Sequence, residues 1–431
     1  MQKQKEFWKY FFDVFKRAKW LILRYLIVAL YLTTTSIFAN KLNLENLTYF
    51  NAILGLSLFA EFIGFGIANA IGTYINQNFQ NKKNIKIYVK SGIKIAVIVS
   101  LIFVFILLVF NNFVLFSILK QSTKIDKNFY FFMLFYIFFA SILSYFVHIL
   151  KFLNNFLPVL ITSILQFLTL LFGFLFNYFC LNLSLNFIAI NFVLATIISI
   201  TYSLCFLQKK YKINLFSKEK LTSNIIQKKF VFKMLFQQLI CQISLVLTSY
   251  FILKSNKLLF NQYAYFENVL DIFNGLFFAF ASIINIDICQ ELGKQNFKKA
   301  YKIGKFAIVG TAFVWLLYFC CCLIFSKLLL SGMNNEILQN NFYSMILYTL
   351  LHLLRFVCWI LNCYILCSSG EMKILLIEEI VCSLYFMYLY IFASFWNLSV
   401  VTIYLMIALP SIFEIIIGIF LFRQKKWLKK I

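Results

Sequence analysis

The stretch DICQELGKQNFKKAYKIGK, residues 287–305, is a polar segment between two long apolar runs. A similar segment, INQNFQNKKNIKIYVKSGIK, occupies residues 75–94. Several residues of the two segments match at an offset of 213 positions. The matched pairs are Gln77 and Gln290, Lys86 and Lys299, and Tyr88 and Tyr301. This agreement predicts two halves of similar structure, in which each polar segment joins the second helix of its half to the third.

The composition predicts a membrane protein. Of the 431 residues, 62% are hydrophobic and 13% are charged, whereas soluble domains carry about 25% charged residues. Long apolar runs recur along the whole chain. Each run can cross a hydrocarbon core of roughly 30 Å, and it must do so as a helix because the lipid offers the backbone no hydrogen-bond partners. The predicted fold class is therefore an all-α polytopic membrane protein.

Twelve transmembrane helices are predicted, in two lobes of six. The spans cover residues 20–39, 47–77, 95–116, 129–148, 157–180, 187–207, 231–253, 260–290, 306–326, 342–366, 374–395 and 400–422. Because six is an even number, both lobes begin on the same side of the membrane, and we expect parallel repeats. The predicted divisions are a cytoplasmic or interfacial segment (1–19), an N-lobe (20–207), a basic cytoplasmic linker (208–230), a C-lobe (231–422) and a basic cytoplasmic tail (423–431).

The net charge of +25 follows from the predicted topology. With the N-terminus inside, and with the basic stretch counted to residue 233, the predicted cytoplasmic segments hold 31 Lys and Arg residues and the outer segments hold 7. This bias obeys the positive-inside rule and predicts that both termini are cytoplasmic, in the inner (cell) membrane. We expect the basic residues to contact anionic lipids of the bilayer, and we expect no nucleic-acid partner. Residues 1–19 have the pattern of an interfacial amphipathic helix ahead of a signal anchor.

No motif supports an enzymatic or metal-dependent function. The 11 cysteines and 2 histidines form no C-x-x-C pair, so neither a disulfide framework nor a zinc site is expected. The sequence has no P-loop, no dinucleotide-binding fingerprint and no H-E-x-x-H motif. We predict that the protein is not an enzyme, has no catalytic residues and uses no cofactor. Transport would then be driven by an ion gradient, with H⁺ or Na⁺ as the coupling ion, or by the membrane potential.

Ionisable residues inside the spans are the candidate site residues, because a charge at membrane depth costs about 2.5–3.5 kcal/mol. Glu267 and Asp271 lie four residues apart in the eighth span, on one helical face. Two carboxylates at this spacing repel each other, which favours a shared proton or a bound cation. The alternative is that they line a hydrated outer vestibule. Arg355, in the tenth span, either pairs with a carboxylate or binds an anion through two hydrogen bonds.

Further charged residues lie within the spans, among them Glu61, Glu414, Arg24 and Asp287. Glu61, in the second span, is another candidate for the site. Glu414 follows Pro410, which should kink the twelfth span, and it either faces the cavity or pairs with a neighbour. Arg24 lies towards the cytoplasmic end of the first span, where we expect it to act as an anchor. Asp287 lies near the cytoplasmic end of the eighth span, where we expect it to reach water or a lysine.

Several short motifs resemble those of the multidrug and toxic compound extrusion (MATE) family. CQELGKQNFKKAYKIGKFA at 289–307 is similar to the segment after the second helix of each lobe in that family. CSSGEMK at 367–373 resembles its turn between helices ten and eleven, and LATIIS at 194–199 resembles part of its sixth helix. FLFNYF at 174–179 contains Asn177, which resembles an asparagine of the fifth helix. The motifs are shared with the wider superfamily that includes flippases for lipid-linked oligosaccharides.

The resemblance implies two V-shaped lobes that rock around a central cavity. It adds Asn177, Gln238 and Gln242 to the candidate substrate or ion sites, because the two glutamines stand near the position of a glutamate in the family's seventh helix. The first span, LIVALYLTTTSIFANKL at 26–42, departs from the family because it has neither a carboxylate nor a proline.

Three functions are compatible with these patterns. The first is a MATE-like antiporter that exports organic cations or drugs in exchange for H⁺ or Na⁺, and it requires carboxylates in the cavity. The second is a flippase or exporter of a lipid-linked oligosaccharide or polysaccharide precursor, which requires a cationic cavity built around Arg355 and Arg24. The third is a membrane-embedded transferase, which the short outer loops do not favour. We expect a monomer whose partners are the lipid bilayer and a small-molecule or lipid-linked substrate.

Overall fold

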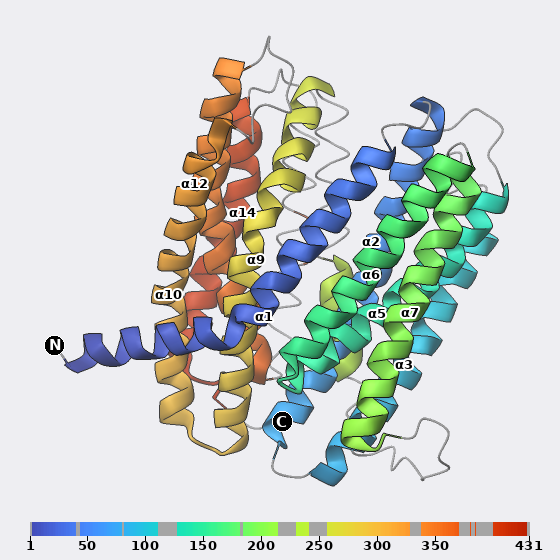
Figure 1. The fold of residues 1–431 in the computed structure, drawn as a ribbon. Helices are drawn as coiled ribbons and strands as arrows, with labels where there is room; N and C mark the ends of the chain where they lie inside the picture. The colour runs from blue at the N-terminus through green and yellow to red at the C-terminus, as the bar shows by residue number, and fades with distance from the viewer. Residues whose placement is uncertain are drawn as a thin grey trace. The chain divides into compact units, whose positions relative to one another are not determined.

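The structure, a computed structural model, describes residues 2–39, 44–79, 82–110, 127–181, 184–213, 230–240, 257–327, 338–369, 380, 384 and 400–428. The regular structure of these residues is entirely helical, as the sequence predicts (Figure 1). By its internal contacts the chain divides into two units. The N-terminal unit is Leu23–Leu239, and the C-terminal unit is Met1–Ile22 together with Ile240–Ile431. The lobe boundaries derived from the sequence stay predictions.

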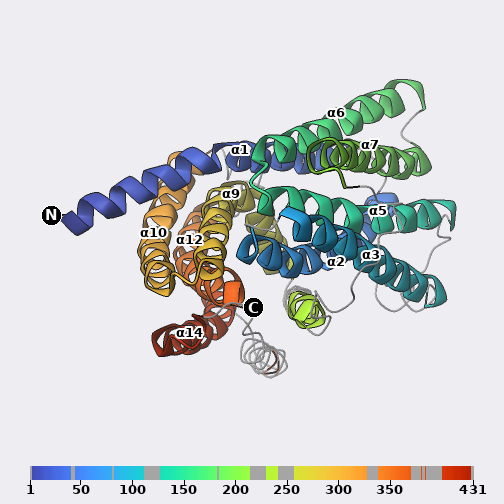
Figure 2. The ribbon, with the colours of Figure 1, turned by 90° about the horizontal axis from the view of Figure 1, so that it is seen from below.

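The N-terminal unit is organised around α5 (Lys127–Phe152). This helix packs against α2, α3, α6 and α7. Figure 2 shows α5 between α2 and α3 on one side and α6 and α7 on the other. The bounds of these helices are α2 (Leu44–Gln77), α3 (Lys82–Val109), α6 (Phe156–Cys180) and α7 (Leu185–Tyr211). The described part of this unit also includes residues 23–39, the second half of the first helix, and residues 230–239 of a shorter apolar helix, Phe230–Ile240.

A row of small residues lets α2 and α5 approach closely. Ala60, Gly64, Ala68 and Gly72 recur at every fourth position of α2 and so lie along one face of the helix. A Cβ atom added to Gly64 would lie 2.1 Å from the carbonyl oxygen of Ser141 in α5, so no larger residue fits. Small residues are the usual means by which membrane helices bring their backbones together.

The C-terminal unit contains α9 (Lys257–Gly293), α10 (Phe297–Ile324), α12 (Leu338–Trp359) and α14 (Val400–Gln424). Helix α10 packs against α9 and α12, and α14 packs against α12. The chain continues from α12 into a π-helical turn, η3 (Ile360–Ile365), and a 3-10 turn, η4 (Leu366–Ser369). Asn285 of α9 donates a hydrogen bond of 2.7 Å to the carbonyl oxygen of Tyr364 in the π turn. This bond ties the irregular backbone to α9.

The first half of α1 (Gln2–Ala39) belongs to the C-terminal unit. The guanidinium of Arg17 forms two hydrogen bonds with the carboxylate of Asp287, and Tyr10 donates a third. Aromatic side chains of this segment pack on α9 and α10, as with Trp8 on Phe313 at 4.9 Å between ring centroids. The carboxylate of Asp287 therefore meets an arginine of the N-terminal segment, whereas the sequence suggested water or a lysine.

Each polar segment lies between two helices, and residues 80 and 81 of the first segment are outside the described part of the chain. The first joins α2 to α3, and the second joins α9 to α10. In the second, Gln295 has a left-handed backbone with φ 58°, and the amides of Gln295 and Asn296 donate to the carbonyls of Leu292 and Glu291. This is a Schellman ending, which normally has glycine at the left-handed position. The side chain of Asn296 then accepts a hydrogen bond from the Lys299 amide and caps α10.

Seven described helices are long and apolar enough to cross a membrane, which makes the protein a multi-pass membrane protein. They are Ile85–Val109, Asn128–Phe152, Phe156–Cys180, Leu185–Tyr211, Phe273–Gly293, Phe297–Ile324 and Phe342–Ser369. Each agrees with one of the twelve predicted spans, although several begin earlier. Helix α3, for example, begins at Lys82, whereas the predicted span begins at residue 95, because the lysine-rich segment before the span is itself helical.

Candidate functional site

A cluster of ionisable residues lies inside the N-terminal unit. Its members, which we call the Glu61 cluster, are Arg24 of α1, Glu61 of α2, and His148 and Lys151 of α5. Arg24 lies within electrostatic range of the other three. Of these four residues, the sequence predicts Glu61 as a site residue and Arg24 as an anchor, or as part of the cationic cavity of a flippase. The structure brings Arg24 to Glu61.

Helix α5 places its contributions to the cluster by their spacing. Ser144, His148 and Lys151 lie at positions i, i+4 and i+7, which is one face of the helix. The Ser144 hydroxyl donates a hydrogen bond of 2.7 Å to the carbonyl oxygen of Glu61. Nδ1 of His148 lies 2.8 Å from the Ser144 carbonyl oxygen, which assigns the proton to Nδ1. This spacing is the sequence signal by which His148 and Lys151 could have been found.

Lys151 is buried, with 5% of its side chain surface exposed. Its ammonium lies 5.7 Å from the ring centroid of Phe65, one helical turn after Glu61 on α2. The imidazole of His148 packs against the same ring at 4.6 Å. Lys151 also stands in the last turn of α5, where the helix dipole favours a cation. The cluster therefore holds a buried ammonium by aromatic contact and by the helix end.

The charges of the Glu61 cluster do not balance. Arg24 and Lys151 are two basic residues, and Glu61 is the one acidic residue of the four. Two phenols, Tyr31 of α1 and Tyr136 of α5, lie within electrostatic range of Glu61, and their oxygens are 3.5 Å apart. Phenols carry no charge near neutral pH. The site formed by the described residues is thus basic, with one carboxylate that is exposed.

Asn177 lies at the end of α6 and connects it to α7. Its amide donates to the carbonyl oxygen of Ser184 at 3.2 Å, and its side-chain oxygen accepts from the Ser184 amide at 3.1 Å. Asn177 is fully buried, so both polar groups need partners and the backbone of the α6–α7 connection supplies them. The geometry shows a structural contact for Asn177, and its role in substrate binding stays a prediction.

Gln238 is buried in the helix Phe230–Ile240 of the N-terminal unit. Its Cγ lies 3.4 Å from the position a Cβ atom would take on Gly66 of α2, so this helix packs closely on α2. Gln242 lies outside the described residues. The interpretation of the two glutamines as site residues stays a prediction.

In the C-terminal unit, Glu414 of α14 accepts a hydrogen bond of 2.5 Å from the thiol of Cys358 in α12. The amide of Asn362, in the π turn, lies 3.7 Å from the same sulfur. Glu414 therefore meets a polar neighbour on α12, which is one of the two arrangements that the sequence allowed. Arg355 lies one turn before Cys358 and is half-buried. The two alternatives for Arg355, pairing with a carboxylate of the chain or binding an anion, stay predictions.

Glu267 and Asp271 lie in α9, as the sequence predicts. Their side chains are outside the described part of the structure, so their proposed pairing with Arg355 stays a prediction. Among the described residues, no group of three or more His, Cys, Asp or Glu side chains is placed to hold a metal ion.

The fold of the chain is similar to solved structures of MATE transporters. An outward-facing MATE family transporter of the MOP superfamily has a TM-score of 0.80 and 14% identity, over 97% of this chain and 96% of that one. A mutant of a Vibrio cholerae MATE transporter has a TM-score of 0.82 and 14% identity, over 97% of this chain and 98% of the other. No protein-family model and no curated protein sequence matches the chain.

A third similar structure is a MOP superfamily transporter from Pyrococcus furiosus, with a TM-score of 0.79 and 12% identity over 97% of this chain and 96% of that one. Its binding pocket is described as having reverse polarity, which suggests a different function for that protein. These likenesses confirm the predicted fold, an all-α membrane protein of twelve helices in two six-helix lobes. At this level of identity they show the fold alone.

Proposed function

We propose that the protein is a secondary transporter of the MOP superfamily, and that its substrate is an anionic amphiphile such as a lipid-linked glycan precursor. We infer the substrate class from the basic character of the Glu61 cluster. Arg24 and Lys151 stand within electrostatic range of each other, with Glu61 as the carboxylate beside them. An anionic headgroup would offset the repulsion between the two cations.

The proposed mechanism is alternating access, driven by an ion gradient or by the membrane potential. A substrate can shift the equilibrium between the two states of a transporter only to the extent that it binds the two states with different affinities. The guanidinium of Arg24 is suited to a phosphate or carboxylate because it presents a planar fork of donors. We place the protein in the inner cell membrane with both termini cytoplasmic, on the strength of the 31 to 7 distribution of Lys and Arg.

A second candidate function is the export of organic cations in exchange for H⁺ or Na⁺. Two observations favour it. Glu61 is an exposed carboxylate at membrane depth, and such a group can carry a proton or attract a cation. Glu267 and Asp271 add a carboxylate pair on one face of α9. The two candidates differ in the sign of the charge that the substrate carries, so one experiment separates them.

The experiment uses the purified full chain in proteoliposomes with two probes. The first is a fluorescent polyprenyl phosphate whose outer-leaflet population is quenched by an added reductant, and the second is ethidium. The anionic function predicts that the wild type moves the polyprenyl phosphate and that Arg24→Gln lowers the rate about tenfold, which corresponds to 1.4 kcal/mol. Arg423→Gln, at the exposed end of α14, removes the same charge and should leave the rate unchanged.

Two outcomes would contradict the proposal. One is transport of ethidium, lost in Glu61→Gln, with no movement of the polyprenyl phosphate, which supports the cation exporter. The other is an equal loss of rate in Arg24→Gln and Arg423→Gln, which shows that only net charge matters.

A further inference from the structure

The first half of α1 uses its most apolar face to dock on the C-terminal unit. Phe11, Val14 and Ala18 lie at positions i, i+3 and i+7, which is one face of the helix, and all three are buried. The ring of Phe11 packs on Phe280 of α9 at 5.9 Å between centroids. An interfacial amphipathic helix normally turns its apolar face to the lipid. Here that face is covered by protein, so any contact with lipid must use another face.

The other side of the same helix carries lysines and exposed aromatic rings. Lys5, Lys9, Phe12 and Lys16 occupy positions i, i+4, i+7 and i+11, which lie along one side of a helix. The three lysines are exposed, and 65% of the Phe12 surface is exposed. Trp8 lies at the edge of this side and is 38% exposed. We call these five residues the outer face of α1.

Both acidic residues of this segment are paired within the chain. Glu6 forms an ion pair with Lys302 of α10 at 2.5 Å. Asp13 forms one with Arg17, four residues later in the same helix, at 3.0 Å. Among the residues that the structure describes, no ion pair includes a lysine of the outer face. The outer face is therefore positively charged, and the described part of the chain does not neutralise it.

The docking contacts place this helix where α10 enters its apolar span. The ring of Phe7 packs on Phe306 at 5.7 Å between centroids. The predicted span begins at residue 306, and no charged residue occurs between Lys305 and Lys327. Figures 1 and 2 show the first half of α1 running across α10. Because the hydrocarbon begins at this level, the outer face lies at the depth of the lipid headgroups.

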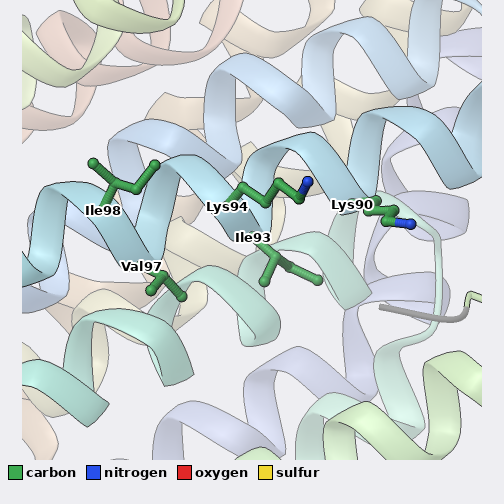
Figure 3. Close-up of a pocket in the computed structure, with 5 residues that line it drawn as sticks. All are labelled: Lys90, Ile93, Lys94, Val97 and Ile98. Atoms are coloured by element: carbon green, nitrogen blue, oxygen red, sulfur yellow. The ribbon is translucent and has the colours of Figure 1, made fainter. Parts of the chain in front are cut away.

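A groove on α3 also combines lysines with an apolar surface (Figure 3). It is lined by Lys90, Ile93, Lys94, Val97 and Ile98. Lys90 is buried and interacts with another residue of the chain. An ammonium that is buried and already bonded is not available to a headgroup. The exposed lysines of the outer face differ from Lys90 in both respects.

We propose that the outer face of α1 binds the headgroups of anionic phospholipids, with Phe12 and Trp8 among the upper parts of the acyl chains. The charge identifies the lipid class, because three exposed ammoniums on one side of a helix attract anionic headgroups. The rings set the depth, because aromatic side chains favour the interface between headgroups and hydrocarbon. The helix is thus held between the C-terminal unit on one side and lipid on the other. This binding does not rest on the proposed transport function.

The test measures the fluorescence of Trp8 in proteoliposomes that contain the full chain. Phosphatidylcholine vesicles receive increasing fractions of phosphatidylglycerol with brominated acyl chains, because bromine quenches a tryptophan only at close range. The signal of Trp8 is the difference between the wild type and Trp8→Phe. Brominated phosphatidylglycerol should quench Trp8 more strongly than brominated phosphatidylcholine at equal bromine content. Lys9→Gln should raise the phosphatidylglycerol fraction that gives half of the maximal quenching about fivefold, the factor that one lysine near an anionic surface contributes.

Three controls keep the result specific. Lys298→Gln removes an exposed lysine of α10 and should leave the quenching of Trp8 as in the wild type. Phe12→Ser should weaken the quenching by both lipids with little effect on folding, because Phe12 is exposed. A salt concentration of about 1 M, at which the Debye length is about 3 Å, should remove most of the preference for phosphatidylglycerol.

Three outcomes would overturn the proposal. The first is equal quenching of Trp8 by the two brominated lipids in the wild type. The second is an equal loss of quenching in Lys9→Gln and Lys298→Gln, which shows that only net charge matters. The third is no quenching by either lipid, which shows that lipid does not reach the outer face. Light scattering of the wild type and Phe12→Ser then tells whether a second copy of the chain covers it.

Discussion

The guanidinium of Arg17 binds the carboxylate of Asp287 through two parallel hydrogen bonds of 2.8 and 2.7 Å. The two residues are 270 positions apart. The bond to Asp287 raises the pKa of the Arg17 guanidinium. Tyr10 donates to the same carboxylate at 2.7 Å, and burial followed by the charge of Asp287 raises its pKa. This contact holds the N-terminal segment against the C-terminal unit, and the raised pKa values keep Arg17 and Tyr10 protonated as donors at neutral pH.

The first prediction concerns this contact. In a double-mutant cycle of Arg17→Ala and Asp287→Ala, the two residues should couple by about 1–2 kcal/mol in thermal unfolding. The value should stay below that of a fully buried pair, because 35% of the Arg17 side chain is exposed and solvent screens the charge. The exposed pair Lys302–Glu6 serves as the control and should couple by less than about 1 kcal/mol. Additive effects of the two alanine substitutions would show that the bidentate bond contributes no stability of its own.

The second prediction concerns the packing of α2 on α5. Gly64→Ala places a methyl group 2.1 Å from the carbonyl oxygen of Ser141, and a backbone atom cannot move aside cheaply. We expect a loss of about 1–3 kcal/mol or more in stability, measured by thermal unfolding in detergent. Gly66→Ala is the matched control on the same helix, since its new methyl group would lie 3.1 Å from Leu235 Cα. If both variants melt at the same temperature, the close approach is not what requires glycine at position 64.

The third prediction concerns the turn between α9 and α10. Gln295 has φ 58°, a conformation that costs a residue with a Cβ atom about 1–2 kcal/mol. Gln295→Gly should therefore stabilise the protein by up to about 1 kcal/mol, since glycine loses part of the gain to chain entropy. Lys298→Gly, inside α10, should instead destabilise by about 0.5–1 kcal/mol. A lower melting temperature for Gln295→Gly would contradict this reading of the turn.

Much of the fold follows from patterns that the sequence carries locally. Apolar run length predicts the spans, because a hydrocarbon core requires about 20 residues of helix. The match of Lys86 with Lys299 predicts two equivalent connections, and each polar segment does lie between two helices, α2 and α3 or α9 and α10. The left-handed Gln295 was not predictable, because the turn signal at such a position is normally glycine.

The candidate site was less predictable, because it depends on the rotation of helices that are distant in the sequence. Arg24 and Lys151 come from α1 and α5, and nothing local in the sequence indicates that Arg24 lies close to both Lys151 and Glu61. The resemblance to the MATE family suggested a binding role for Asn177, and its hydrogen bonds in the structure go to Ser184, seven residues later. A buried side-chain amide at a helix end forms hydrogen bonds with nearby backbone groups of the adjacent connection. Which groups these are depends on the conformation of the connection, which the sequence does not show.

The fourth prediction concerns topology. The distribution of Lys and Arg predicts that the tail 423–431 is cytoplasmic. On a cysteine-free background, Lys430→Cys should resist an impermeant thiol reagent in intact cells and react after permeabilisation. Lys124→Cys, in a predicted outer loop, should react in intact cells and serves as the control. Labelling of position 430 in intact cells would reverse the proposed orientation.

The last prediction separates the carboxylates of the two units. Glu267 and Asp271 share one face of α9, and Glu61 lies in the basic cluster of the N-terminal unit. If the substrate is anionic, Asp271→Asn should leave polyprenyl phosphate transport nearly unchanged, whereas Arg24→Gln should lower it about tenfold. If a cation is exported, Asp271→Asn should abolish ethidium transport at equal membrane level, because an amide neither carries a proton nor attracts a cation. Glu267→Gln is the matched substitution on the same face of α9. Loss of polyprenyl phosphate transport in Asp271→Asn would contradict the anionic assignment, and it would move the site to the carboxylate pair of α9.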